Sequence, residues 1–306
     1  MIKLRSFAKI NLGLEITGKR EDGFHFLKTI FQTVSLHDSI EIKKNNTKKI
    51  SLNGNNKSVQ WDDTNSIMKA IKIIYGNFNL SQGFDIFVSK NIKPGSGLGG
   101  GSSNAAVIIM FLENYFSLSL KNREKIEIAK SIGADVPFFL FGGTMLGEGI
   151  GEILTSVKEL EEQKIAIISP EIEVSTKLIF SSFNLTTKPR KSKIDTFLGS
   201  GDISILKNEL ETTTFDLFPE LKEIKEKMVN LKLKPVLMSG SGSSIYCFPE
   251  KEHIAPLRTK FPNITISKTL NRKEYFKNIG AWPSGKASVF GADIRWFESS
   301  RPRKDK

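Results

Sequence analysis

The stretch that decides the fold reads Pro94-Gly95-Ser96-Gly97-Leu98-Gly99-Gly100-Gly101-Ser102-Ser103-Asn104. Five glycines in the seven positions 95–101 let the backbone turn sharply and approach a ligand closely. The loop follows an alternating, strand-like segment at 84–88 and leads into 105–112, which is apolar on every side, as in a buried helix. Its amides and the start of that helix, capped by Ser102 or Ser103, predict a phosphate-binding site.

Three generic motifs compete with this interpretation. Gly95, Gly97 and Gly100 satisfy the dinucleotide fingerprint of an oxidoreductase, but residues 117–123 lack the acidic side chain that the fingerprint requires. A protein-kinase loop would be followed by His-Arg-Asp and Asp-Phe-Gly motifs, which the sequence does not contain. Residues 280–287 nearly spell a Walker A motif, but its last position lacks the hydroxyl that binds magnesium.

A second glycine loop, Met238-Ser239-Gly240-Ser241-Gly242-Ser243-Ser244, separates two apolar segments. Taken alone, it fits a tight hairpin equally well. Taken with the first loop, it predicts a second backbone surface close to the bound phosphates.

Composition excludes several classes of protein. The 306 residues carry a net charge of +12, but the lysines are spread along the chain and alternate with glutamates, which is typical of a solvated surface. Nucleic-acid binding therefore stays an alternative whose signature would be a steep dependence on salt. The single Cys247 excludes an internal disulfide and is expected to be a buried, inert thiol. The absence of a long apolar run or a signal-peptide pattern predicts a cytoplasmic protein without a membrane partner.

Periodicity and turn residues predict two domains, 1–154 and 155–275, with a cleft between them. The expected strands are 4–15, 39–43, 84–88 and 165–168, with a strand–loop–strand unit at 235–248. The expected helices are 67–74, ended by Gly76, then 105–112, 122–132 and 219–231. Asn53-Gly54 predicts a hairpin turn. Residues 276–306, with two of the three tryptophans and more arginine than the body, are expected to form a disordered tail.

Several motifs in order resemble a known family. Phe7-Ala8-Lys9-Ile10-Asn11-Leu12, the first glycine loop and Ser239-Gly240-Ser241-Gly242 look like the three motifs of the GHMP kinase superfamily. Residues 18–25, 133–139 and 142–152 narrow the resemblance to the diphosphocytidyl-methylerythritol kinases. The resemblance covers roughly residues 3–270. Phe24 departs from it, standing where tyrosine is usual, and Lys93-Pro94-Gly95 slightly rearranges the entry to the loop.

The resemblance implies an α+β, two-domain GHMP kinase fold. Its N-terminal domain would be ribosomal-S5-like and bind ATP, and its C-terminal domain would be an α/β sandwich on the substrate side. The implied reaction moves the γ-phosphate of ATP, with Mg²⁺, onto the C2 hydroxyl of a diphosphocytidyl-methylerythritol, a cytidine diphosphate substrate. We expect a monomer or weak homodimer. Another GHMP kinase, acting on a mevalonate-like or sugar alcohol, is the nearest alternative.

The resemblance also implies roles for two charged residues. Asp135 would accept the proton of the substrate hydroxyl, as a positioned carboxylate can. Lys9, partly desolvated among apolar neighbours, would keep Asp135 ionised and neutralise charge in the transition state. Without the family, Asp135 also fits a helix N-cap, and Lys9 fits a lysine that faces solvent.

The remaining site residues are likewise implied by the resemblance. Nucleotide contacts are assigned to Asn65, which fits a helix N-cap equally well, and to Pro94, Gly95, Gly97, Leu98, Gly99, Gly100, Gly101, Ser102, Ser103 and Asn104. Substrate contacts are assigned to Asn11, Phe24, His25, Thr176, Phe180, Gly240 and Gly242. Phe24, His25 and Phe180 would hold the cytosine. No side chain is assigned as a dedicated metal ligand, although the Ser102 hydroxyl and phosphate oxygens are candidates for Mg²⁺.

Overall fold

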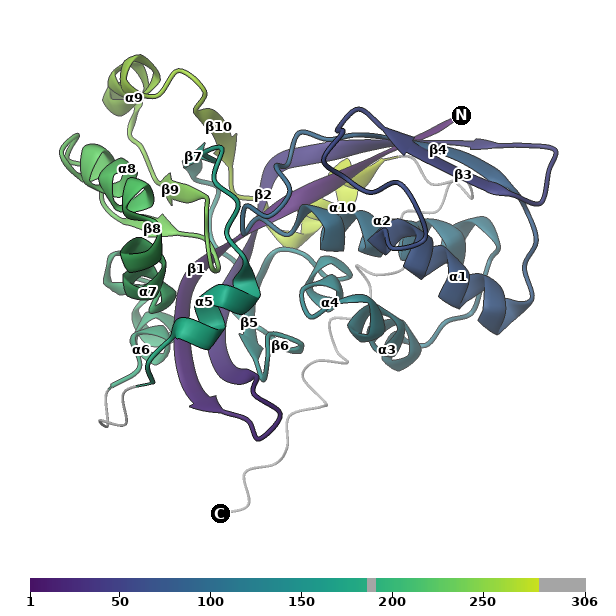
Figure 1. Ribbon diagram of the computed structural model, residues 1–306, viewed down its shortest axis with the longest axis horizontal. Helices are drawn as coiled ribbons and strands as arrows, with labels where there is room; N and C mark the ends of the chain where they lie inside the picture. Colours follow the sequence, from purple (N-terminus) through teal and green to yellow (C-terminus); the bar gives the residue numbers. More distant parts are fainter. Residues whose placement is uncertain (186–190, 281–306) are drawn as a thin grey trace.

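The computed structural model describes residues 1–185 and 191–280. The structure has two sheets, each with its own group of helices, and a long hairpin of the first sheet extends from one half of the molecule to the other (Figure 1). The first sheet, in the order β3-β4-β2-β5-β6 with β1 paired to β2, contains β1 (Ile2–Lys19), β2 (His25–Lys44), β3 (Ile50–Gly54), β4 (Phe84–Ser89), β5 (Thr144–Glu148) and β6 (Ile153–Ser156). The second sheet, in the order β10-β7-β9-β8, contains β7 (Lys164–Ile168), β8 (Val236–Met238), β9 (Ile245–Cys247) and β10 (Thr265–Lys268).

The hairpin of β1 and β2 joins the two halves of the molecule. The strands pair antiparallel from Ile2 opposite Ile42 to Lys19 opposite His25. Leu4 at one end of β1 packs in the core beneath the first sheet, whereas Ile16 near the other end packs in the core of the second. Both cores therefore depend on the same strand.

Helices cover one face of the first sheet. They are α1 (Ser66–Phe78), α2 (Gly100–Tyr115), α3 (Asn122–Ile132), α4 (Val136–Phe139) and α10 (Arg272–Ile279). The buried helix expected at 105–112 is confirmed, because every residue from 103 to 112 is buried in α2. Its start differs from the prediction. Gly99, with φ of 70°, is the N-cap, so neither Ser102 nor Ser103 caps the helix.

The second sheet carries the other helices. They are α5 (Thr176–Ser182), α6 (Lys193–Ser200), α7 (Leu210–Leu217), α8 (Pro219–Val229) and α9 (Ile254–Lys260), with 3₁₀ turns at Ile203–Ile205 and Lys251–His253. Cys247 is fully buried in β9, and burial raises the pKa of its thiol to about 12, as expected for an inert cysteine. The two-domain α+β architecture predicted from the sequence is confirmed.

Two local predictions were wrong. Asn53-Gly54 does not form a hairpin turn, because β3 pairs in parallel with β4 and the chain returns through α1. A parallel pair needs such a crossover. Gly76 does not end α1, which continues to Phe78 and closes on Asn79 with φ of 50°. Asparagine tolerates this left-handed conformation, so it serves as the C-terminal signal here.

The expected boundaries also need correction. The division after residue 154 falls inside β6, which belongs to the first sheet. The expected tail starts inside α10, whose Tyr275 and Ile279 are fully buried against the first core. Their spacing of four residues places them on one helix face, a signal that the change in composition obscured. Residues 281–306, including most of the Walker-like stretch, lie outside the described residues.

Ile279 tests whether the end of α10 belongs to the core. Ile279→Ala should lower the free energy of unfolding by about 2–5 kcal/mol, the usual cost of truncating a buried aliphatic side chain. Lys277→Ala, at an exposed position on the same helix, should stay within about 0.5 kcal/mol of the parent. Urea denaturation followed by circular dichroism measures both. Equal stabilities for the two variants would show that Ile279 contributes nothing to the core.

Candidate active site

Lys9 lies in the interior of the site, on β1. Its side chain is only 4% exposed, and its Nζ is 3.2 Å from Oδ2 of Asp135. The ammonium also donates to Oδ1 of Asn11 at 2.7 Å and lies 5.4 Å from the centre of the Phe31 ring. A buried lysine needs partners of this kind to remain charged. Lys9 is therefore held as a cation aimed at Asp135, not as the solvent-facing lysine of the alternative.

Asp135 is positioned by the turn between α3 and α4. It occupies the N-cap position of α4, but its side chain makes no capping hydrogen bond. Its carboxylate is 32% exposed and pairs with Lys9 instead. Gly151, from the loop between β5 and β6, passes nearby, so that a Cβ added there would lie 3.9 Å from Oδ1 of Asp135. The carboxylate is thus available to a ligand while its charge is compensated from behind.

The two glycine loops pack against each other directly above Lys9. The Ser239 hydroxyl donates to the carbonyl of Gly97 at 2.9 Å, and the amide of Ser244 donates to the carbonyl of Ser96 at 3.0 Å. The amide of Lys9 donates to the carbonyl of Leu98 at 2.9 Å, which ties β1 to the first loop. The hypothesis that the second loop is a second surface beside the first is supported by these contacts.

Helix α2 begins within the first glycine loop, at Gly100. The N-cap Gly99 provides no side-chain hydrogen bond, and the first turn contains no acidic residue. The first amides of an α-helix have no partner within the helix and carry a partial positive charge. Together with Lys9, they give the site a positive potential suited to phosphate.

Side chains of the first loop fall into two groups. Leu98, Ser103 and Asn104 are buried in the protein, so their side chains are not open to a ligand. Ser102 is half-buried at the start of α2. Pro94 is also half-buried, and the glycines present backbone alone.

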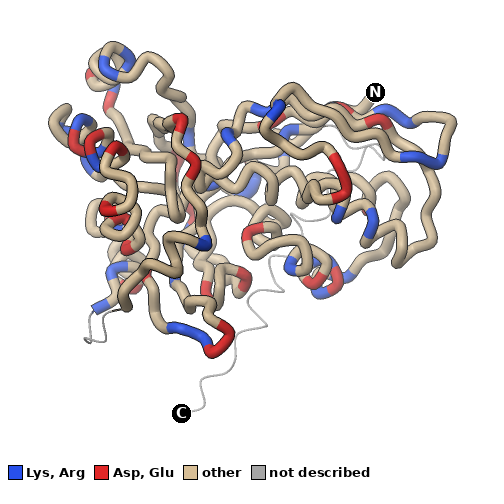
Figure 2. The backbone as a smooth tube through the Cα atoms, viewed as in Figure 1, with Lys and Arg blue, Asp and Glu red and all other residues tan. Residues whose placement is uncertain are grey.

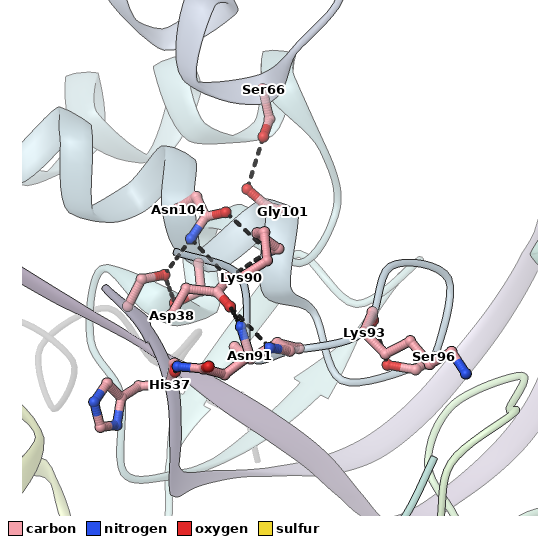
Figure 3. Close-up of polar contacts among 12 residues, drawn as sticks. His37, Asp38, Ser66, Lys90, Asn91, Lys93, Ser96, Gly101 and Asn104 are labelled. Carbon is pink, nitrogen blue, oxygen red and sulfur yellow. Dashed lines mark hydrogen bonds and ion pairs between the residues drawn. The ribbon is translucent and has the colours of Figure 1, made fainter. Parts of the chain in front are cut away.

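Asn65 occupies the N-cap of α1. Its side chain accepts a hydrogen bond from the amide of Ile67 and donates one to the carbonyl of Gln60, so the N-cap interpretation holds. The neighbouring Ser66, which the sequence reasoning missed, donates instead to the carbonyl of Gly101 at 2.8 Å (Figure 3). The capping pattern drew attention to Asn65 and gave no signal for Ser66.

The residues expected to hold a base lie at the start of β2 and on α5. His25 and Phe180 are brought together, with ring centroids 5.7 Å apart, and Phe183, which was not predicted, meets His25 edge-on at 6.1 Å. Nδ1 of His25 is buried without a hydrogen-bond partner. Burial, followed by the charge of Lys19, lowers the pKa of His25, which favours the neutral imidazole. Phe24, the residue before His25 in the sequence, is 59% exposed.

Helix α5 connects this aromatic cluster to the second glycine loop. The Thr176 hydroxyl lies 2.9 Å from the hydroxyl of Ser241, inside the second loop, and Phe180 contacts His25. Residues four apart share one helix face and are separated by about 6 Å along its axis. The second loop also places Gly240 beside Asn11, whose Oδ1 would lie 3.4 Å from an added Cβ. A Cβ added at Gly242 would lie 2.9 Å from the sulfur of Met238, so a larger residue there would collide with the strand that precedes the loop.

Other classes of site receive no support from the described part of the chain. Within residues 1–185 and 191–280, no group of three or more His, Cys, Asp or Glu side chains is placed to hold a metal ion. None of the helices in these ranges is both long and apolar enough to cross a membrane. Lys and Arg alternate with Asp and Glu along the tube in Figure 2, as on α8, and do not gather into one stripe.

Comparisons with known proteins agree with this geometry. Residues 65–143 match the model of the GHMP kinases N terminal domain, and residues 197–264 match that of the GHMP kinases C terminal. The chain is 36% identical to the 4-diphosphocytidyl-2-C-methyl-D-erythritol kinase of Clostridium beijerinckii, over 88% of this chain and 100% of that protein. It is 40% identical to the kinase of the same name from Persephonella marina, over 81% of this chain and 92% of that one.

A solved structure gives the same result. The crystal structure of a 4-(cytidine 5'-diphospho)-2C-methyl-D-erythritol kinase superposes with a TM-score of 0.74 at 29% identity, covering 88% of this chain and 99% of that chain. The chain therefore belongs to the family of 4-diphosphocytidyl-2-C-methyl-D-erythritol kinases, within the GHMP kinases.

Proposed function

We propose that this chain is an ATP-dependent kinase that phosphorylates 4-diphosphocytidyl-2-C-methyl-D-erythritol, a precursor in isoprenoid biosynthesis, on its C2 hydroxyl. The observation that carries the proposal is the Lys9–Asp135 ion pair beneath two interlocked glycine loops. Phosphoryl transfer depends on positioning and charge stabilisation more than on covalent chemistry by the protein. The site supplies both.

In the proposed chemistry, Asp135 accepts a proton and Lys9 stabilises negative charge. The substrate hydroxyl lies against Asp135, and its oxygen bonds to the γ-phosphorus while the bond from that phosphorus to the β-phosphate oxygen breaks. The hydroxyl proton passes to the Asp135 carboxylate, which is 32% exposed, and ADP leaves. Lys9 remains protonated, because its Asn11 and Asp135 contacts stabilise the cation, and it offsets the charge that spreads over the phosphoryl oxygens.

Mg²⁺ fits this site as a companion of ATP, not as a metal of the protein alone. It prefers oxygen ligands and is commonly held by phosphates, water and one or two protein groups. The half-buried Ser102 hydroxyl at the start of α2 is an oxygen donor of this kind. When bound, the ion neutralises the phosphates, and the protein amides and Lys9 add to that effect.

The aromatic cluster of His25, Phe180 and Phe183 favours a cytidine substrate over the alcohols that other GHMP kinases use. His25 and Phe180 offer ring faces for a base, and the unpartnered Nδ1 of His25 offers one polar contact. Helix α5 carries this pocket on the same face as Thr176, which contacts the second glycine loop. A ligand with a base joined through phosphates to an alcohol matches that arrangement, whereas a mevalonate-like alcohol would make no contact with His25 and Phe180.

ATP turnover measured with the cytidine substrate, mevalonate and homoserine tests the proposal directly. Turnover with either small alcohol alone would replace it by another GHMP activity.

Asp135 tests the assignment of the base. Asp135→Asn preserves the shape of the side chain but removes its charge and its capacity to accept a proton. We expect kcat to fall by about 10²- to 10⁴-fold, with the affinity for ATP, measured by calorimetry, unchanged. Asp63→Asn, at an exposed aspartate paired with Lys72, is the control and should retain the parental kcat. A near-parental kcat for Asp135→Asn, with chemistry as the slow step, would remove Asp135 from the mechanism and leave Lys9 as the main candidate.

His25 tests the position of the base pocket. His25→Ala removes a contact made equally in the ground state and the transition state, so KM for the cytidine substrate should rise more than kcat falls. We expect an increase in that KM of about tenfold or more, equivalent to about 1.4 kcal/mol, while KM for ATP stays within about twofold. His253→Ala, on a distant 3₁₀ turn, should change neither constant. A selective rise in the KM for ATP would mean that this pocket binds the nucleotide.

A further inference from the structure

A second buried lysine–carboxylate pair lies beside the first glycine loop, and the proposed chemistry does not use it. Asp38, on β2, is fully buried and pairs with Lys90, whose side chain is only 5% exposed. Figure 3 shows Asp38 and Lys90 next to Asn104 of α2. Burying two charges is costly, and an apolar pair of similar size is often no less stable. Its presence next to the loop therefore requires an explanation other than stability.

The Asp38 carboxylate binds both ends of the loop at once. Oδ1 accepts hydrogen bonds from the amides of Asn91 and Ile92, each at 2.8 Å, where the chain enters the loop. Oδ2 accepts from the Lys90 ammonium and, at 3.1 Å, from the side-chain amide of Asn104, where the chain leaves the loop. Four donors match the four acceptor sites of an ionised carboxylate.

The same contacts define the space around the N-terminus of α2. A Cβ added at Gly100 would lie 3.1 Å from Nζ of Lys90 and 2.9 Å from Cγ2 of Ile92. Both neighbours are held by Asp38, one through its ammonium and the other through its amide. The position of the carboxylate therefore limits how far the first residue of the helix can move.

A bulge in β2 aims Asp38 at this position. Phe7 pairs with His37 and Ala8 with Val34, so two residues of β2 have no counterpart on β1 just before Asp38. Bulges commonly redirect a side chain next to a functional site. Asn104 also donates to the hydroxyl of Ser6, the residue of β1 opposite Asp38, which extends the network to both strands of the hairpin.

From this geometry we propose that Asp38 is a positioning residue for nucleotide binding. It does not touch ATP. Its buried carboxylate holds residues 90–92 and the start of α2 at the separation that lets the loop amides converge on phosphate. The identity of the ligand, ATP, rests on the proposed function. The role of Asp38 rests on the geometry of the loop.

Asp38→Asn is the decisive variant. Its amide oxygen can still accept from Asn91 and Ile92, but its NH₂ group would face the donors of Lys90 and Asn104. We expect KM for ATP to rise about tenfold or more, while KM for the cytidine substrate stays within about twofold. The dissociation constant for ATP with Mg²⁺, measured by calorimetry, should rise in parallel. If Asp38 had a purely structural role, neither KM nor the dissociation constant for ATP would rise more than KM for the cytidine substrate.

A matched control separates loop geometry from lost stability. Lys125 and Glu113 form another largely buried pair, at 2.9 Å, between α3 and the far end of α2. Glu113→Gln should destabilise the fold without changing KM for ATP. If Asp38→Asn does not fold, Asn104→Ala takes its place, because it cuts the tie between α2 and Asp38 without removing a charge, and its KM for ATP should rise too.

The outcomes are distinct. An unchanged KM for ATP in a folded Asp38→Asn, or in Asn104→Ala where the first does not fold, overturns the proposal, as does an equal rise in both Michaelis constants. If the parent protein fails to phosphorylate the cytidine substrate, the proposed function fails. Calorimetry with ATP and Mg²⁺ on the same variants then still decides the role of Asp38.

Discussion

The contact between Gly97 and the second glycine loop is the constraint on which the rest of the site depends. A Cβ at Gly97 would lie 2.1 Å from the carbonyl oxygen of Ser239, and the residue has φ of +77°. Only glycine satisfies both conditions. This close approach brings a loop of the first domain onto a loop of the second and covers Lys9. The floor of the site is therefore made by two segments about 140 positions apart in sequence, held by backbone geometry.

The sequence predicted those parts of the fold whose signals are local. The glycine loop, the buried α2 and the ordered motifs around Lys9 and Asp135 each carry their own pattern. Pairings between distant segments had no local sequence pattern that could predict them. The strand β3 pairs in parallel with β4 in spite of the hairpin signal of Asn53-Gly54, and α1 forms the crossover between the two strands. Similarly, the packing of α10 on the first core overruled the change in composition near residue 276.

The candidate site shows the same division between local and distant information. Family resemblance located Lys9, Asp135, His25 and Phe180, and the structure brings each pair together. It did not distinguish side chains from backbone, so Ser103 and Asn104 were assigned to the nucleotide although their side chains are buried. The importance of Asp38 could not be read from sequence, because its four donors come from segments more than 50 positions away.

The two buried lysines beside the first glycine loop are proposed to have different roles because their carboxylate partners differ in exposure. The carboxylate that pairs with Lys9 is 32% exposed, so it can meet a ligand, and the ion pair can rearrange as charge moves during transfer. The carboxylate that pairs with Lys90 has no exposed surface and has all its acceptor sites occupied. Such a group can only hold its neighbours in place. In these proposals, chemistry and positioning are separated by solvent access, although both pairs consist of the same two functional groups.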